Sequence, residues 1–140
     1  FFDAYVEEEK GKTVLYLGDQ SGSRKVYLKG EKAEIARARE LHKKVILGIR
    51  PEDIYEQKDA EERGILEDTV GVEETITARE MLGAEVILYF DKKGKSHAVK
   101  LSPENQTQTG EKIRFYFDPS RIHIFDQGTE ENIFYREEIR

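Results

Sequence analysis

The chain has 140 residues, enough for one domain or for two small subdomains that share a core. Its formal net charge of −6 disfavours sequence-independent binding to a nucleic-acid backbone. The lack of cysteine excludes disulfides and thiolate metal sites, and no apolar run reaches the length of a membrane span. We therefore expect a cytoplasmic protein that does not insert directly into a membrane.

The first half of the chain contains three strand patterns and one helical pattern. Residues 13–17 and 25–29 are rich in β-branched and aromatic side chains, and residues 45–49 include an apolar run that resumes the β pattern. Residues 31–44 are dominated by good helix formers, with acidic residues early and basic residues late, which suits the helix dipole. We predict a surface helix there that caps the end of a barrel.

The second half has the clearer strand patterns. We predict strands over residues 74–80, 85–90, 95–101, 112–118 and 121–126, with a break at 81–84, a hairpin turn at 91–94 and a polar loop at 102–110. Many short strands with regular turns predict an all-β fold with one short helix, built as two OB-like antiparallel Greek-key barrels that can share strands. The charged connector 53–63, ended by Gly64, separates a first barrel over 1–63 from a second over 64–140.

The segment 45–54, VILGIRPEDI, is the most distinctive stretch, because no generic strand or helix requires its order. It closely resembles the LGIRPE signature in the C-terminal regulatory domain of the ATP-binding subunits of bacterial sugar-importing ABC transporters. Further segments that are similar to this family, in the same order, are residues 1–4, 81–86 (MLGAEV), 110–117, 123–126 (HIFD) and 128–129.

This resemblance implies a function carried by protein contacts and not by catalysis. In that family the region is a pair of OB-like subdomains of the TOBE or molybdate-binding-protein-like (MOP) type. It follows the ATPase domain, pairs two subunits and, in some members, receives regulatory proteins. By position, Phe125 is expected at the subunit contact with His123 beside it, and Gly48 matches a glycine linked to sensitivity to regulatory proteins. The remaining signature residues are Arg50, Pro51 and Glu52.

The resemblance also implies that the chain is a fragment of a longer protein, in keeping with its start at Phe1 without an initiator methionine. We expect no catalytic residue, cofactor or metal in this fragment, whereas the full-length protein would bind ATP and Mg²⁺ as a carbohydrate-importing ATPase. The expected partners are a second copy of this domain, permease subunits reached through the missing ATPase domain, and a regulatory protein. The full-length protein would lie at the inner face of the cell membrane.

Several of these residues also have a purely structural interpretation. Phe125 could belong to the core of a small barrel, and Gly48 could be a bulge or a point of close approach within a strand. Arg50 could fix the strand end by donating hydrogen bonds to nearby carbonyls or to a carboxylate. The three histidines are isolated in the sequence, so none is predicted to bind a metal.

Two other functions stay open on sequence grounds. A MOP-like module for small oxyanions would use Lys95 and Ser96. An OB-fold that binds single-stranded nucleic acid would use tyrosines beside lysines, but the net acidity of the chain argues against this function. The residues available to it are Tyr16, Tyr27, Tyr89, Lys25 and Lys29. Residues 11–13 and 94–96 end like phosphate-binding loops, yet both lead into strands, so this fragment is not predicted to bind ATP.

Overall fold

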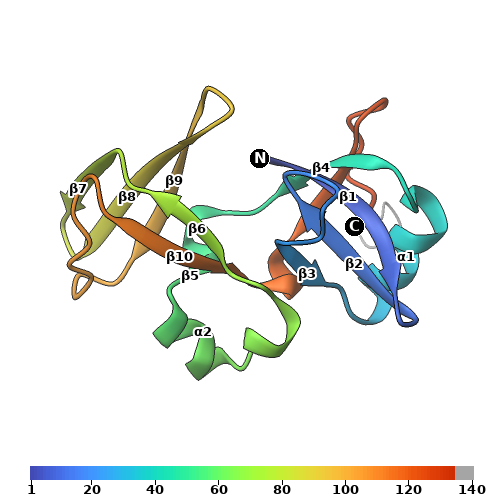
Figure 1. The fold of residues 1–140 in the computed structure, drawn as a ribbon, viewed down its shortest axis with the longest axis horizontal. Helices are drawn as coiled ribbons and strands as arrows, with labels where there is room; N and C mark the ends of the chain where they lie inside the picture. Colours follow the sequence, from blue (N-terminus) through green and yellow to red (C-terminus); the bar gives the residue numbers. More distant parts are fainter. Residues whose placement is uncertain (135–140) are drawn as a thin grey trace.

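The computed structural model describes residues 1–134 and arranges them in two lobes (Figure 1). In chain order the strands and α-helices are β1 (Phe2–Glu9), β2 (Lys12–Leu17), β3 (Lys25–Tyr27), α1 (Gly30–Glu40), β4 (Lys44–Gly48), β5 (Ile54–Tyr55), α2 (Gln57–Arg63), β6 (Val72–Thr75), β7 (Ala78–Leu82), β8 (Glu85–Lys92), β9 (Lys95–Leu101), β10 (Lys112–Phe117) and β11 (His123–Asp126). Three short 3-10 helices link them: η1 (Pro51–Asp53), η2 (Leu66–Asp68) and η3 (Pro119–Arg121).

A five-stranded antiparallel sheet in the order β11-β4-β1-β2-β3 forms the first lobe together with α1. The sequence predicted no strand over β1, since Glu7, Glu8 and Glu9 lower the strand propensity. The strand forms because it pairs with both β2 and β4, and because its alternation places Ala4 and Val6 in the core. Tertiary pairing therefore overrides local propensity in this strand.

Helix α1 ends earlier than predicted, at Glu40 and not at Lys44. Leu41 leaves the helical region with a ψ of 131°, and His42 adopts a positive φ of 66°. The amide of His42 then donates to the carbonyl oxygen of Val6 at 2.7 Å, and Lys44 already begins β4. Pairing with β1 thus draws the last predicted turn of the helix into the sheet.

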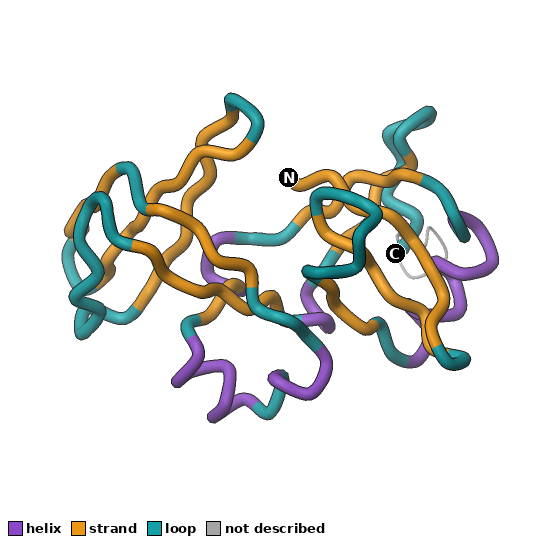
Figure 2. Tube along the Cα trace, viewed as in Figure 1, coloured by secondary structure: helices purple, strands orange, loops and turns teal. Residues whose placement is uncertain are grey.

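Two three-stranded antiparallel sheets, β5-β10-β6 and β7-β8-β9, form the second lobe (Figure 2). The predicted strand over 74–80 is divided into β6 and β7 by a short link that contains the buried Ile76. The predicted break over 81–84 is wrong for Met81 and Leu82, which continue β7 and pair with β8. The hairpin between these strands needs only two residues for its turn.

A second short helix, α2, occupies most of the segment that was predicted as a charged connector. It ends at Gly64, as predicted: the positive φ of 70° lets the glycine amide donate back to the carbonyl oxygen of Glu61 at 3.1 Å. Its buried Ala60 packs with Ile65 and Tyr116 in a small satellite core. The described residues are mostly β, as predicted, and contain two short α-helices in place of one.

The second lobe is one continuous segment from β5 to β10, inserted between β4 and β11 of the first lobe. β11 follows the predicted boundary at residue 64 but lies in the sheet of β1 to β4, and β5 precedes that boundary but pairs with β10. The two predicted halves, 1–63 and 64–140, therefore share strands. Their separation at residue 63 as folding units stays a prediction.

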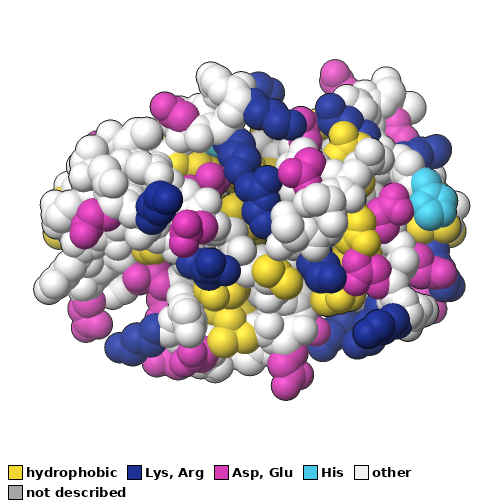
Figure 3. All heavy atoms as spheres, viewed as in Figure 1, with side chains coloured by type: hydrophobic (Ala, Val, Ile, Leu, Met, Phe, Trp, Pro, Cys, Tyr) yellow, Lys and Arg dark blue, Asp and Glu magenta, His cyan; other side chains and the backbone are white. Residues whose placement is uncertain are grey.

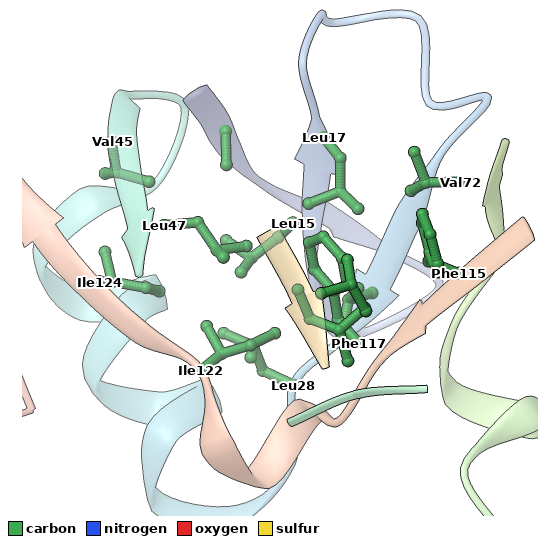
Figure 4. Packing of buried hydrophobic residues seen from close by; sticks show 14 of the residues in the cluster. Leu15, Leu17, Leu28, Val45, Leu47, Val72, Phe115, Phe117, Ile122 and Ile124 are labelled. Atoms are coloured by element: carbon green, nitrogen blue, oxygen red, sulfur yellow. The ribbon is translucent and has the colours of Figure 1, made fainter. Parts of the chain in front are cut away.

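One apolar core extends through both lobes (Figure 4). In the first lobe it is aliphatic, and Leu47 and Ile124 are fully buried there. Where the lobes meet it becomes aromatic: the ring of Phe2 in β1 lies 5.2 Å from that of Phe117 and 6.3 Å from that of Phe90. Apolar packing thus joins the two lobes, and burial of such side chains is the main favourable contribution to folding.

Candidate interaction surface

The predicted site residues of β4 and β11 lie together on one face of the first sheet. β11 is one of the two edge strands of this sheet, and in its antiparallel pairing with β4, His123 lies opposite Gly48 and Phe125 opposite Ile46. Because neighbouring residues of a strand point to opposite faces, the buried Ile124 faces the core while His123 and Phe125 face away from it. We call this outward surface, with the adjoining residues 50–52, the β4–β11 face.

Gly48 is a point of close approach on this face. A Cβ atom built there would lie 2.8 Å from Cε2 of Phe125 and 3.2 Å from Cε1 of Phe1, and the first distance is shorter than Cβ contacts allow. The rings of Phe1 and Phe125 meet edge to face with centroids 5.6 Å apart. Phe125 is partly buried and lies outside the main core cluster, and Phe1 is 70% exposed. The glycine therefore lets two aromatic rings lie over the backbone of β4.

His123 is partly buried and neutral on this face. Burial, with the positive charges of Lys32 and Arg50, lowers the pKa of His123 below its ordinary value. The side-chain amide of Asn132 lies 3.2 Å from Nδ1 of His123, and since that amide nitrogen can only donate, the imidazole accepts. A neutral histidine can lie next to an aromatic ring without an unpaired charge.

The signature residues form the crossing from the first lobe to the second. Arg50 is extended (φ −78°, ψ 147°), as expected before a proline, and Pro51 begins η1, which lies beside β9. The amide of Asp53 donates to the carbonyl oxygen of Arg50 at 2.9 Å. The side chains of Arg50 and Glu52 are exposed, and within residues 1–134 neither forms a hydrogen bond or an ion pair. The hydrogen bonds predicted for the Arg50 side chain are thus not found in this part of the chain.

Sequence reasoning missed the polar support beneath β11. Asp126 accepts from the amides of Gly128 and Thr129, both at 2.9 Å, in a turn that folds the chain back along β11. A hydrogen bond from Glu40, followed by those amides, lowers the pKa of Asp126 to about 2. Glu40 is only 2% exposed, and burial together with Asp126 raises its pKa. The Asp-x-Gly-Thr order in the sequence is the signal that could have predicted this turn.

The residues proposed for the two alternative functions are arranged differently. Lys95 and Ser96 are exposed where β9 leaves the β8–β9 turn. Lys25 and Tyr27, which a single-strand binder would use, instead donate to Glu9 at 3.0 and 2.9 Å, and Tyr16 donates to the same carboxylate. These bonds, with Tyr16 contributing most, lower the pKa of Glu9 to about 2, and the Glu9 carboxylate neutralises the charge of Lys25. Lys29 is likewise paired, with Asp68 at 2.9 Å.

Both tripeptides that end like phosphate-binding loops belong to hairpins. Lys10 and Gly11 join β1 to β2, Lys93 and Gly94 join β8 to β9, and all four residues have positive φ. Neither turn opens a helix, so no helix N-terminus is available there for a phosphate. Within residues 1–134, no three His, Asp or Glu side chains are grouped so that they could hold a metal ion. The helices of this described part are all too short or too polar to cross a membrane.

The strand order and the shared core define an OB-like fold, and a solved structure has the same architecture. The cytoplasmic molybdate-binding protein ModG, determined with molybdate bound, aligns with a TM-score of 0.60 over 88% of this chain and 92% of that one, at 12% identity. At this identity the likeness concerns the fold alone. It confirms the predicted OB-like, MOP-type class.

The sequence profile of the TOBE domain matches residues 47–125, and the chain belongs to this family. It is 35% identical over 107 residues to the uncharacterized ABC transporter ATP-binding protein YcjV of Escherichia coli K12, covering 76% of this chain and 28% of that protein. It is 35% identical over 92 residues to the trehalose/maltose import ATP-binding protein MalK of Thermococcus litoralis, and 30% identical over 91 residues to the oligosaccharides import ATP-binding protein MsmX of Bacillus subtilis. These two alignments cover 66% and 65% of this chain and 24% of each relative. The resemblance predicted from the sequence is confirmed, and the chain spans about a quarter of the length of these relatives.

Proposed function

We propose that this chain is a non-catalytic regulatory and dimerisation domain of the ATP-binding subunit of a carbohydrate ABC importer. Its family and the names of its relatives support the importer assignment. The single observation that supports the pairing role is the β4–β11 face, where Phe125, His123 and Gly48 are packed together on the side of the sheet that faces away from the core.

The face has the composition of a protein contact. The aromatic rings of Phe1 and Phe125 adjoin the exposed side chains of Arg50 and Glu52, which form no hydrogen bond within residues 1–134, and an apolar centre with a polar rim is the usual arrangement in interfaces. In a two-fold pairing the same patch of each copy meets its equivalent, so Phe125 of one copy would lie near the axis. The exposed charges of Arg50 and Glu52 would form the rim or receive a regulatory protein.

The activity of the whole protein would reside outside this chain. An ATPase domain that precedes Phe1 would bind ATP and Mg²⁺ and would contact the permease subunits at the inner face of the membrane. The paired domains would hold the two subunits together while the catalytic domains open and close. A regulatory protein that binds one state of this pair better than the other would shift the equilibrium between them. The gene should therefore encode a phosphate-binding loop upstream of Phe1, and a gene without one would refute the assignment.

Sedimentation equilibrium of the purified chain tests the pairing role. We expect a reversible dimer that Phe125→Ser weakens by about 2 kcal/mol, or roughly thirtyfold, because removal of a central aromatic anchor has an effect of this size. Met81→Ser is the matched control, since Met81 is 53% exposed on β7 in the other lobe. A chain that stays monomeric at high concentration, or one that only the Met81 variant dissociates, would contradict the proposal.

A MOP-like oxyanion module is the second candidate, favoured by the ModG fold and by the exposed Lys95 and Ser96. Such a site would need backbone amides and hydroxyls that converge with a cation. Isothermal titration with molybdate and with tungstate distinguishes the two functions, because pairing predicts no heat from either anion.

A further inference from the structure

A pocket of about 80 Å³ lies between the two lobes, beneath the β8–β9 hairpin. Its floor is apolar, and strands of both lobes contribute to it: Phe2 and Leu17 come from β1 and β2, while Val72, Phe115 and Phe117 come from β6 and β10. Figure 4 shows the side chains of Leu17, Val72, Phe115 and Phe117 gathered at this place. These apolar side chains cannot replace the water around a strongly hydrated ion, and the one imidazole beside them, His97, is stacked on Phe2 with ring centroids 4.3 Å apart.

The rim of the same pocket is cationic. Four basic side chains line it, Arg24, Lys92, Lys93 and Lys95, against two carboxylates, Asp3 and Glu74, which leaves a net side-chain charge of +2 on a chain whose net charge is −6. Figure 3 shows Lys and Arg side chains in a row over the line where the lobes meet. A positive rim over an apolar floor attracts an anion that also has an apolar part.

The basic side chains differ in how far they are already paired. Lys92 lies 3.3 Å from Glu74, and Lys93 lies 3.3 Å from Asp3, so both are engaged with the carboxylates of the rim. Arg24 lies 3.6 Å from Asp19, which is outside the pocket lining, so it has a looser ion pair. Within residues 1–134, Lys95 forms neither an ion pair nor a hydrogen bond. Lys95 is therefore the cation most available to a ligand.

We propose that this pocket binds a small organic anion, whose carboxylate or phosphate group contacts Lys95 and Arg24 while a short aliphatic chain lies on the aromatic floor. The volume is roughly half of the 150 Å³ cavity that admits benzene, so a chain of about four carbons fits better than a ring. Because both lobes line the pocket, the bound ligand would contact both and would stabilise their arrangement. This inference goes beyond the proposed function and does not rest on it.

Methyl NMR of the 140-residue chain, titrated with butyl phosphate, tests the site directly. We expect saturable shifts of the Leu17 and Val72 methyl groups with a Kd on the order of 1 mM, and no shift of Leu28, which is buried in the first lobe outside the pocket. Affinity should rise about fourfold for each methylene added from methyl to butyl phosphate. Inorganic phosphate and 1-butanol, which each lack one half of the ligand, should bind at least tenfold more weakly.

A pair of charge variants identifies the rim contact. Lys95→Gln should weaken the binding of butyl phosphate two- to fivefold, the range expected for an exposed cation. Lys100→Gln is the matched control, because Lys100 is exposed on the same strand but lies outside the pocket. This variant should bind butyl phosphate with the affinity of the unchanged chain. Three results would overturn the proposal: equal affinity for phosphate and butyl phosphate, equal loss in both variants, or unmoved Leu17 and Val72 methyl groups at about ten times the expected Kd.

Discussion

Different kinds of contact stabilise the interior of each lobe. In the first lobe, buried aliphatic residues are surrounded by polar ties: Lys32 donates from α1 to the carbonyl oxygens of Ser120 and Ile122, both at 2.8 Å, and Glu40 meets Asp126 at the end of β11. The second lobe depends on aromatic rings, with those of Phe90 and Phe115 5.6 Å apart. The carboxyl pair of Glu40 and Asp126, whose pKa values are shifted in opposite directions, belongs to the first lobe, so this pair should make the stability of that lobe depend on pH.

The polar contacts of the second lobe are also less complete. Arg79 donates to the carbonyl oxygen of Asn105 at 2.9 Å, and the Asn105 amide donates to Glu56 at 2.6 Å. The Nε atom of Arg79 is buried, however, and has no partner among the described residues. An unmade hydrogen bond of this kind lowers stability, so packing contributes the larger share there.

The largest effect should come from the aromatic packing. Phe115→Ala should destabilise the chain by about 3–5 kcal/mol at every pH, because the ring is 1% exposed and its removal leaves a cavity. Urea denaturation followed by circular dichroism measures this loss. Leu82→Ala is the control, since Leu82 is 55% exposed and should change stability by less than about 0.5 kcal/mol. A loss below about 1 kcal/mol for Phe115→Ala would mean that aromatic packing is not the main source of stability in the second lobe.

The next effect concerns the β4–β11 face. Gly48→Ala should destabilise the chain by about 1–3 kcal/mol, because the new Cβ would lie 2.8 Å from the ring of Phe125. Adding Phe125→Ala should recover most of this loss, and a double-mutant cycle by urea denaturation gives the coupling between the two positions. Additive effects of the two substitutions would mean that the ring moves aside freely.

Glu40 should make the first lobe lose stability as the pH rises. Its pKa in the folded chain is raised by burial and then by Asp126, so its contribution is present below its unfolded pKa and is lost as the pH passes the folded value. Glu40→Gln keeps a donor toward Asp126 at every pH. We expect the variant to match the unchanged chain near pH 4.5 and to be more stable by on the order of 1 kcal/mol at about pH 8. If the free energy of unfolding of the variant and of the unchanged chain varied in the same way with pH, Glu40 would not be protonated preferentially in the folded chain.

Glu9 should produce the smallest effect, with the opposite sign. Its pKa of about 2 lies below the ordinary 4.5, so its contribution is present above pH 4.5 and is lost as the pH falls toward 2. Glu9→Gln should lower stability by about 0.5–1 kcal/mol at neutral pH and by little near pH 2, as expected for a partly exposed pair. An equal loss at both ends of this range would assign the effect to packing.

The sequence predicted those elements that their own residues specify. The hairpin over 85–101 was predicted because apolar strands flank a turn that ends in Gly94, and Gly64 was predicted to end its segment because of its conformational freedom. β1 was not predicted because its three glutamates lower the strand propensity, although pairing on both sides stabilises the strand. Met81 and Leu82 were not predicted as a strand because they belong to an edge strand and their side chains are exposed. Long-range pairing does not appear in a local pattern.

The sequence predicted which residues belong to the candidate site but not how they are arranged. The family resemblance named Gly48, His123 and Phe125, but only the pairing of β4 with β11 explains why they lie together. The support from Glu40 and Asp126 depends on a contact between a helix end and a strand far away in the sequence. The inter-lobe pocket likewise combines side chains from six strands, so no single segment of the sequence contains its pattern.

The late return of β11 also has a consequence for how the chain is made. While the ribosome synthesises the protein, β1 to β4 emerge before the inserted lobe and have an open edge until the whole of that lobe has followed. An unpaired edge strand invites pairing with other chains, and contacts that join distant parts of a sequence form slowly. Nascent chains stalled before residue 122 should therefore be more easily digested by protease within residues 44–48 than those that have completed β11.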